Sequence, residues 1–347
     1  MADSTTEKVV VVGDSPVALA IRAHTGAQRG SERAKSPTRF QGVSALVVVA
    51  HDADFERSLQ TKQSLRRENI AARAERAILD ALIARVPHVI VVSSAMVHGA
   101  RLSREIITDS AATCEIVDGF VGDIIYFEYC LQRALLNATQ GAGGPELTFL
   151  RSAAMVGPGI DTLITRHFEA PRLLSLKEQS RAWQFIHIDD VARAVETVIA
   201  HRLTGTLTVG AVTGSDDEEN ETVPDVLSVS QVCALARIRT IELSQTTAFA
   251  MAERLHQFGV LPAPPIDMEY AVYDWTVMPQ RLLSAGWRPQ YSSSQCVAAL
   301  MEQTRGKLGV GGRRVATRDA AALGAAGAAV AVLGTAAAWR QVRTGRK

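Results

Sequence analysis

Four short runs of mostly apolar, β-branched residues constrain the fold of this chain more than any other feature. The runs cover residues 8–13, 44–50, 85–95 and 146–153. A nearly continuous apolar run is typical of a strand buried on both faces, because a half-exposed strand alternates apolar with polar residues. Between the runs, residues 66–85 and 122–138 carry apolar side chains at helical spacing. This alternation predicts a doubly wound α/β fold around a parallel sheet.

The composition narrows the function classes. The 37 Lys and Arg residues and 36 Asp and Glu residues leave a formal net charge of +1, so no strong positive field favours nucleic acid. The four cysteines form no CxxC pair, which argues against a zinc site and a disulfide framework. The first eight residues are mostly polar and begin no recognisable signal peptide. We therefore expect a cytoplasmic protein with neither a metal nor a nucleic-acid partner.

Three motifs carry a family signature. They read VIVVSSAMVHG (89–99), FLRSAAMVGPG (149–159) and QFIHIDDVARAV (184–195). Together they resemble the extended short-chain dehydrogenase/reductase family, the NAD-dependent nucleotide-sugar epimerases and dehydratases. The corresponding family segments are Ser-Ser-x-x-Val-Tyr-Gly, Arg-Pro-x-x-Val-Tyr-Gly-Pro-Gly and Phe-Val-His-Val-Asp-Asp-Val-Ala. Their order and spacing agree with the family from about Lys8 to Arg305.

The resemblance implies a two-part architecture. Residues 1–160 would form a Rossmann-like domain that binds NAD or NADP. Residues 161–305 would form a mixed remainder that includes a small α/β substrate-type domain. Ligands in open parallel sheets bind at the carboxyl ends of the strands, which is where the sequence puts Ser93 and Ser94.

The catalytic pair of the family is missing at its usual place. The resemblance implies a tyrosine base and a lysine four residues later, which share a helix face so that the cation favours the phenolate. Counted back from Arg151 by the family's interval, these positions hold Ile124 and Glu128. The sequence therefore predicts that the usual catalysis is impaired or lost.

A second pair with the same spacing remains in the same stretch. Tyr129 is followed four residues later by Arg133, and Ser94 matches the family's hydrogen-bonding serine. Ser94, Tyr129 and Arg133 are the candidate catalytic residues, although this choice shifts the helix by five residues. The alternative is that Tyr129 packs as an aromatic core residue beside a surface arginine. His98 replaces the tyrosine of the Val-Tyr-Gly turn, where a structural histidine is the simpler interpretation.

The cofactor turn is incomplete. The family's Gly-x-x-Gly-x-x-Gly lets the backbone approach a pyrophosphate, but here it reads Gly13, Pro16 and Leu19. A proline suits a helix start, whereas Leu19 puts a bulky side chain where close packing is expected. The candidate cofactor-binding residues are Gly13, Ser15, Pro16, Ser93 and Arg33, and binding of NAD or NADP stays open.

The segment after the first helix is short. Only about 30 residues separate Gly13 from the run at 44–50, where the family has room for a second strand, a helix and a third strand. Residues 25–42 are polar, include several basic residues and show no strand pattern. We expect a sheet truncated after the first βα unit. Arg33 and its basic neighbours would be solvated, or would hold a phosphate.

The C-terminal tail, 306–347, differs from the rest. Residues 320–339 are apolar all round, rich in Ala and Gly, and flanked by basic residues. A hydrophobic helix of this length could cross a bilayer and anchor the protein at the inner membrane face. The alternative is a low-complexity or partner-binding tail.

Two functions follow. The first is an epimerase/dehydratase-like protein that is catalytically impaired or inactive and acts as a binding, sensor or scaffold protein. The alternative is an active nucleotide-sugar epimerase or reductase with atypical NAD(P) binding. The expected partners are a nucleotide sugar or other small ligand, a homo- or hetero-dimer partner, and a membrane through the tail. The dimer is what the resemblance implies, because family members commonly dimerise through helices that include the one at 122–138.

Overall fold

The protein is represented by a computed structural model that describes most of the chain. The described residues are 8–30, 40–53, 55, 61–100, 105–141, 143–170, 172–214, 221–258 and 263–304, with the backbone alone at 308–310 and 313–315. Arg33 and the predicted membrane helix at 320–339 lie outside them, so both stay predictions. Within the described part, no helix has the length and apolar character needed to cross a membrane.

The central element is a six-stranded parallel sheet. Its strand order is β10-β5-β4-β3-β1-β2. The strands span Val9–Val12 (β1), Gln28–Gly30 (β2), Ala45–Val49 (β3), His88–Ser94 (β4), Glu146–Ser152 (β5) and Gly205–Val209 (β10). Every residue of β3 and β4 is buried, as the continuous apolar runs predicted. The predicted α/β fold is confirmed.

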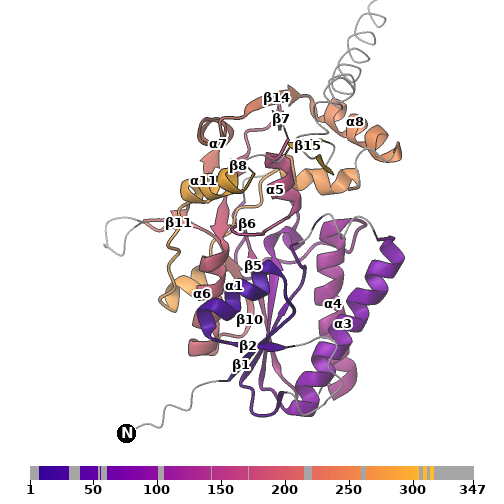
Figure 1. Cartoon of the computed structure of the whole chain (residues 1–347), viewed down its shortest axis with the longest axis vertical. Helices are drawn as coiled ribbons and strands as arrows, with labels where there is room; N and C mark the ends of the chain where they lie inside the picture. Colours follow the sequence, from indigo (N-terminus) through magenta and orange to yellow (C-terminus); the bar gives the residue numbers. More distant parts are fainter. Residues whose placement is uncertain are drawn as a thin grey trace, which may run out of the picture.

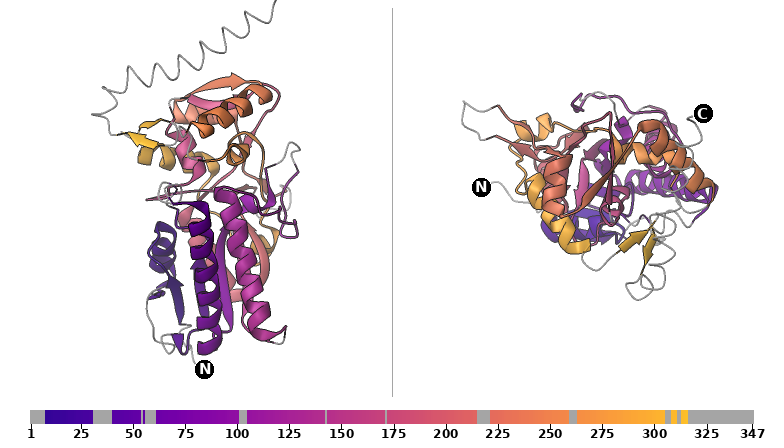
Figure 2. Two further views of the ribbon diagram at one scale, coloured as in Figure 1. Left: turned by 90° about the vertical axis from the view of Figure 1, so that its right-hand side faces the viewer. Right: turned by 90° about the horizontal axis from the view of Figure 1, so that it is seen from above.

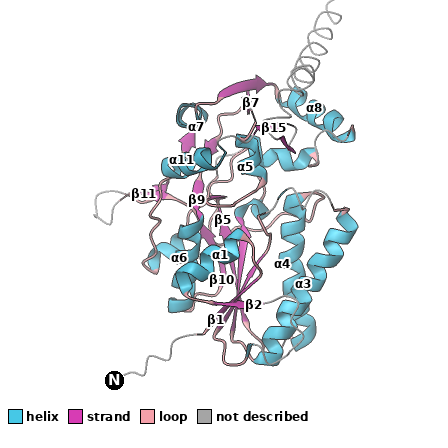
Figure 3. Ribbon diagram, in the orientation of Figure 1, coloured by secondary structure: helices cyan, strands magenta, loops and turns pink. Residues whose placement is uncertain are grey.

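Two pairs of helices enclose the sheet (Figures 1 and 3). On one face α1 (Pro16–Thr25) packs against α6 (Ile188–His201). On the other face α3 (Gln63–Ala84) packs along α4 (Phe120–Thr139). Both α6 and β10 come from beyond residue 160. The chain leaves the sheet after β5, forms the elements from β6 to β9, and then returns to add α6 and β10.

The prediction that residues 25–42 hold no strand is wrong at β2. Gly30 comes so close to β1 that a Cβ atom built on it would lie 2.8 Å from Val10 Cγ1. The strand has three residues, and Gln28 and Arg29 are exposed, so no apolar run marks it. Only 14 residues, 31–44, join β2 to β3, too few for a further helix and strand of ordinary length. The sheet is therefore truncated as predicted, but one strand later.

The remaining elements lie mostly above the carboxyl ends of the strands (Figures 1 and 2). Among the residues described with their side chains, four further strand pairs occur. They are β6–β9 (Ala154–Val156, Phe185–His187), β7–β14 (Arg172–Leu176, Arg239–Leu243), β8–β13 (Ala182–Trp183, Leu227–Ser228) and β11–β12 (Val212–Thr213, Val223–Pro224). The helices are α5 (Leu163–Phe168), α7 (Val229–Ala236), α8 (Gln245–Gln257), α9 (Glu269–Val272), α10 (Gln280–Ser284) and α11 (Ser293–Thr304), with 3₁₀ turns η2 (Ala95–His98) and η3 (Pro265–Met268). At the backbone level, β15 (Leu308–Val310) pairs with β16 (Arg313–Val315).

The strand order fixes where a ligand would bind. β1 lies between β2 and β3, so the chain leaves β1 toward one edge and then returns to its other side. Open α/β sheets bind ligands in the crevice at such a switch point, outside the carboxyl ends of the strands. We therefore expect a ligand to bind at the turns that follow β1, β3 and β4.

Candidate functional site

Three loops meet above the switch point. The loop after β3 and the segment after β6 are hydrogen-bonded, since Asp161 N donates to Ala53 O at 2.9 Å. Gly159, in the Gly-Pro-Gly turn after β6, lies against the start of α1. A Cβ atom built on it would be 3.1 Å from Pro16 Cγ. The first βα turn is thus in contact with the Gly-Pro-Gly turn that follows β6.

The first βα turn itself is well formed. Gly13 has a φ of +93°, a conformation that glycine adopts without strain. The Ser15 side chain caps α1 by accepting from Ala18 N at 3.2 Å, and Pro16 is the first helical residue. The predicted packing problem at Leu19 is wrong, because this side chain is 54% exposed. Helix α1 turns it to solvent and buries other residues instead.

Asp14 places a carboxylate beside this turn. Its side chain forms ion pairs with Arg22 of α1, at 3.2 Å, and with Arg29 of β2. Arg22 also donates from Nη1 to Gly13 O at 2.5 Å. The turn is therefore tied to both neighbouring elements by its own acidic residue.

The two predicted serines lie at the end of β4. Ser93 is fully buried, and its Oγ has no hydrogen-bond partner among the described residues. Ser94 is also buried, and its Oγ accepts from Met96 N at 3.3 Å, which caps η2. Ser94 therefore has a local structural partner, whereas the Ser93 hydroxyl is unpaired.

A buried ion pair stands where the resemblance puts the catalytic pair. Ile124 is 1% exposed and Glu128 is 3% exposed. Arg151 of β5 holds Glu128 with both arms of its guanidinium, Nη2 to Oε2 at 2.6 Å and Nε to Oε1 at 3.2 Å. His98 Nε2 lies 3.4 Å from Arg151 Nη1. Because arginine only donates, His98 accepts through Nε2 and donates from Nδ1 to Ala112 O, 2.8 Å away.

The structure pairs Tyr129 with Arg133 but keeps them away from the sheet. Arg133 Nη1 donates to Tyr129 Oη at 2.9 Å, and its guanidinium carbon lies 5.6 Å from the ring centre. Tyr129 is 41% exposed. It is one residue, or 100°, around the helix from the buried Glu128. Ser94 is buried at the end of β4, and among the described residues its hydroxyl is hydrogen-bonded to Met96 N and to neither Tyr129 nor Arg133.

A pocket in the C-terminal part contains a buried arginine that the sequence analysis missed. Arg181 is 6% exposed, and its Nε and Nη1 have no hydrogen-bond partner among the described residues. Its guanidinium carbon lies 3.3 Å from the centre of the Trp183 ring. Burial lowers the pKa of Arg181 to about 9, although Asp274 acts in the opposite direction.

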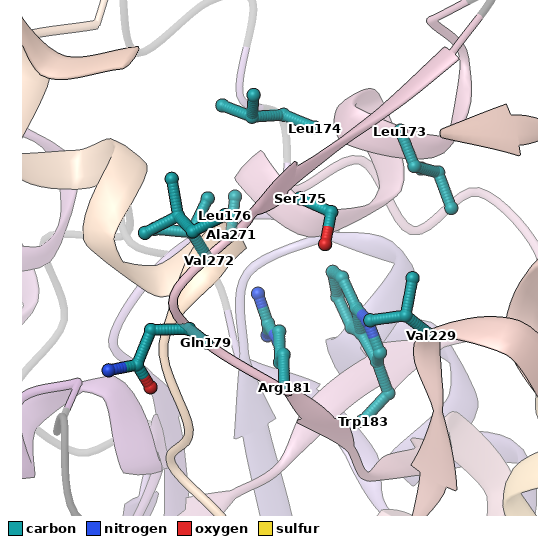
Figure 4. Close-up of a pocket in the computed structure, with 10 residues that line it drawn as sticks. All are labelled: Leu173, Leu174, Ser175, Leu176, Gln179, Arg181, Trp183, Val229, Ala271 and Val272. Atoms are coloured by element: carbon teal, nitrogen blue, oxygen red, sulfur yellow. The ribbon is translucent and has the colours of Figure 1, made fainter. Parts of the chain in front are cut away.

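The rest of this pocket is mainly apolar, with a few polar groups. Figure 4 shows the Arg181 side chain extending between Gln179 and Trp183, with Ser175 above it. Leu173, Val229, Ala271 and Val272 supply apolar walls. The pocket has an empty volume of about 260 Å³, below the roughly 300–1,000 Å³ of typical small-molecule sites, so it has room for one charged group of a ligand and not for a whole nucleotide sugar. Among the described residues, no group of three or more His, Cys, Asp or Glu side chains is arranged to hold a metal ion.

Comparison with known proteins adds to this geometry. No family model and no curated protein sequence matches the chain. Solved structures do. UDP-glucose 4-epimerase from Stenotrophomonas maltophila, with bound NAD and formylated UDP-arabinopyranose, is 13% identical with a TM-score of 0.58, covering 86% of this chain and 98% of its own. The Thermus thermophilus UDP-glucose 4-epimerase complex with NAD is 14% identical with a TM-score of 0.58, covering 86% and 99%. RMD from Pseudomonas aeruginosa, complexed with NADPH, is 12% identical with a TM-score of 0.54, covering 86% and 98%.

This chain has the extended short-chain dehydrogenase/reductase fold. The expectation drawn from its three motifs is thereby confirmed for the fold. One fold hosts many activities, so the function must be argued from the residues of the site. The first βα turn and the end of β4 lie at the carboxyl ends of the strands, where open α/β sheets bind ligands, and Arg181 lies in the C-terminal part.

Arg181 gave little signal in the sequence. It stands two residues before Trp183, and residues two apart in an extended segment share a face. Only the burial of Arg181, with two of its nitrogens lacking a hydrogen-bond partner among the described residues, identifies it. Glu128 gave a clearer signal, a charge reversal relative to the family, but its partner Arg151 could not be known from spacing.

Proposed function

We propose that this protein is a small-molecule binding protein on an epimerase-type fold and does not catalyse hydride transfer. The observation that carries the proposal is the pair Glu128–Arg151 with Ile124 beside it on α4. Isoleucine transfers no proton. A carboxylate at the lysine position would also raise the pKa of any neighbouring phenol rather than favour its charged form.

Arg181 is the proposed ligand-recognition group. A buried guanidinium that lacks partners for two nitrogens is costly, because desolvation of a charge is repaid only by paired hydrogen bonds. A carboxylate or phosphate can accept both hydrogen bonds at once. We infer that the pocket takes the anionic group of a small molecule, and nucleotide sugars are the first class to test, since the Stenotrophomonas epimerase was solved with a UDP sugar.

The cofactor is not part of the proposed chemistry. A dinucleotide needs backbone N–H groups and a positive field at the start of the first helix. The residues present fit this need poorly, since the carboxylate of Asp14 stands at the turn and Pro16 offers no N–H. We therefore derive no step through NAD or NADP.

An active enzyme that uses Ser94, Tyr129 and Arg133 is the second candidate. The 2.9 Å hydrogen bond from Arg133 to Tyr129 Oη supports it, because it places a cation against the phenol at the i, i+4 spacing. Two observations count against it. Tyr129 is 41% exposed, and its side chain lies about 100° around the helix from that of the buried Glu128. In this case Tyr129→Phe would abolish turnover.

A second copy of the chain is a proposed partner. Helices α3 and α4 present exposed apolar side chains, with Leu65 and Leu79 two heptads apart and Tyr129 and Leu136 one heptad apart. Heptad spacing suits packing of helices from two protomers. Sedimentation should show a dimer that Leu79→Asp converts to a monomer; an unchanged mass would remove this partner.

Binding of UDP and UDP-glucose to the full chain, measured by calorimetry, tests the ligand assignment. Arg181→Met should weaken binding at least tenfold, because methionine keeps the packing but offers no donors. Arg254→Met, on the exposed surface of α8, is the matched control and should leave the affinity unchanged. Equal binding by the parent and Arg181→Met would remove Arg181 from the site.

A further inference from the structure

Few backbone N–H groups at the start of α1 are available to bind an anion. A helix begins with backbone N–H groups that have no partner within the helix, and these attract phosphates. Here Pro16 has no N–H, and the Ala18 N–H is taken by Ser15 Oγ. Of the three first helical amides, at most that of Val17 remains for a ligand.

The carboxylate of Asp14 lies where the phosphate of a ligand would otherwise meet the turn. Its carboxylate lies next to the turn and is shared by the guanidinium groups of Arg22 and Arg29. Arg22 comes from the second turn of α1, and Arg29 comes from the adjacent edge strand, whose Gly30 O accepts from Gly13 N at 3.2 Å. The carboxylate therefore bridges the two elements between which a dinucleotide would pass.

The Asp14–Arg29 arm of this bridge contributes little to folding, whereas Arg22 is 13% exposed and stays hydrogen-bonded to Gly13 O without Asp14. The side chains of Asp14 and Arg29 are 52% and 66% exposed. Ion pairs this exposed add little net stability, because water screens both charges. A phosphate arriving at this turn, in contrast, meets a fixed negative charge, and the carboxylate lowers the combined charge of the two arginines from +2 to +1.

We propose that Asp14 is a built-in anion that keeps the phosphates of a dinucleotide off the first βα turn. Removing its charge leaves Arg22 and Arg29 to pair with a pyrophosphate or a ribose phosphate instead, in the geometry that guanidinium groups prefer for phosphate. Asp14 acts at a different place from Ile124 and Arg181. The inference extends the poor fit to a dinucleotide given in the proposed function, whereas the roles of Ile124 and Arg181 are tested separately.

The test is calorimetric titration of NAD, NADP and inorganic pyrophosphate into the full chain and its variants. Asp14→Asn keeps the side-chain shape and removes the charge, so it should bind NADP at least tenfold more tightly than the parent. Adding Arg29→Ala to this variant should reverse the gain. Asp118→Asn is the control, since Asp118 is another exposed carboxylate, 3.8 Å from an arginine on α3.

Each outcome decides the role of Asp14. Parent protein that binds NADP as tightly as Asp14→Asn would overturn it, and so would an equal gain in Asp118→Asn. A gain that persists after Arg29→Ala would also overturn it, because the phosphate would then be held elsewhere. UDP-glucose binding and the melting temperature of each variant should stay unchanged, which separates a local effect from loss of the fold.

Discussion

Glu128 and Arg151 form an ion pair in which both side chains are about 95% buried. Taking two charges out of water is costly, and the cost is offset only while each keeps its partner. The bidentate geometry and the nearby His98 satisfy the guanidinium. At the residue scale, Glu128 therefore has a structural partner in Arg151, and loss of this ion pair is expected to lower stability.

Glu128→Gln should lower the free energy of unfolding by about 3–5 kcal/mol, because it leaves the Arg151 charge buried without its counterion. Urea unfolding measures this. Glu75→Gln, an exposed glutamate on α3, should change stability by less than about 0.5 kcal/mol. The double variant Glu128→Gln/Arg151→Met should recover much of the loss; if it were no more stable than the single variant, the ion pair would not be the cause.

At the scale of elements, α4 depends on a cap from a distant segment. Its N-cap residue is Gly119, which has no side chain to accept a hydrogen bond. Asp267 of η3 does so instead, accepting from Phe120 N at 2.8 Å and Val121 N at 3.3 Å. A carboxylate at a helix N-terminus is also favoured by the helix dipole. The C-terminal part thereby fixes the start of the helix that carries Ile124 and Glu128.

Asp267→Ala should cost about 1–3 kcal/mol of stability, since it leaves two buried N–H groups unpaired. Asp267→Asn keeps an acceptor oxygen and should cost less. The measurement is again urea unfolding, supported by hydrogen exchange at Phe120 and Val121. Equal losses for the two variants would mean that the charge, and not the acceptor, holds the helix.

At the scale of the whole molecule, the partly buried His51 and His167 make stability depend on pH. Burial lowers the pKa of His51 to about 4 and that of His167 to about 3, from the ordinary value of 6.5. The folded state therefore binds fewer protons than the unfolded state below pH 6.5. Stability is complete above that pH and falls as the pH drops toward 4, by about 1.4 kcal/mol per pH unit for each histidine. Burial of Asp267, whose pKa is raised to about 6, opposes this trend.

The contribution of His167 can be isolated. His167→Phe keeps a ring stacked on Trp183, from which His167 is 5.9 Å away, and removes the titrating group. Between pH 7 and pH 5, its free energy of unfolding should fall by about 2 kcal/mol less than that of the parent, because the histidine of the unfolded state takes up its proton only as the pH passes below 6.5. Parallel curves would show that His167 is protonated in the folded state.

Much of this molecule could be predicted from the sequence, for identifiable reasons. The strands β1, β3, β4 and β5 are buried on both faces, so their apolar runs mark them. The edge strand β2 could not be found, because two of its three residues are exposed. The prediction that Leu19 would obstruct packing rested on its place in a glycine motif. The rotation of α1 decides instead that this side chain is exposed. Arg181 carries no pattern, since its unpaired nitrogens arise only from the packing of distant segments.

The central claim is that this epimerase-type fold binds a ligand without hydride transfer. The most direct test is a turnover assay with UDP-glucose and saturating NAD or NADP, following sugar epimerisation and reduced nicotinamide together. We predict no turnover above the uncatalysed rate, from protein that still binds UDP-glucose through Arg181. Turnover by the parent protein that disappears in Tyr129→Phe would contradict the claim and make Tyr129 and Arg133 the catalytic pair.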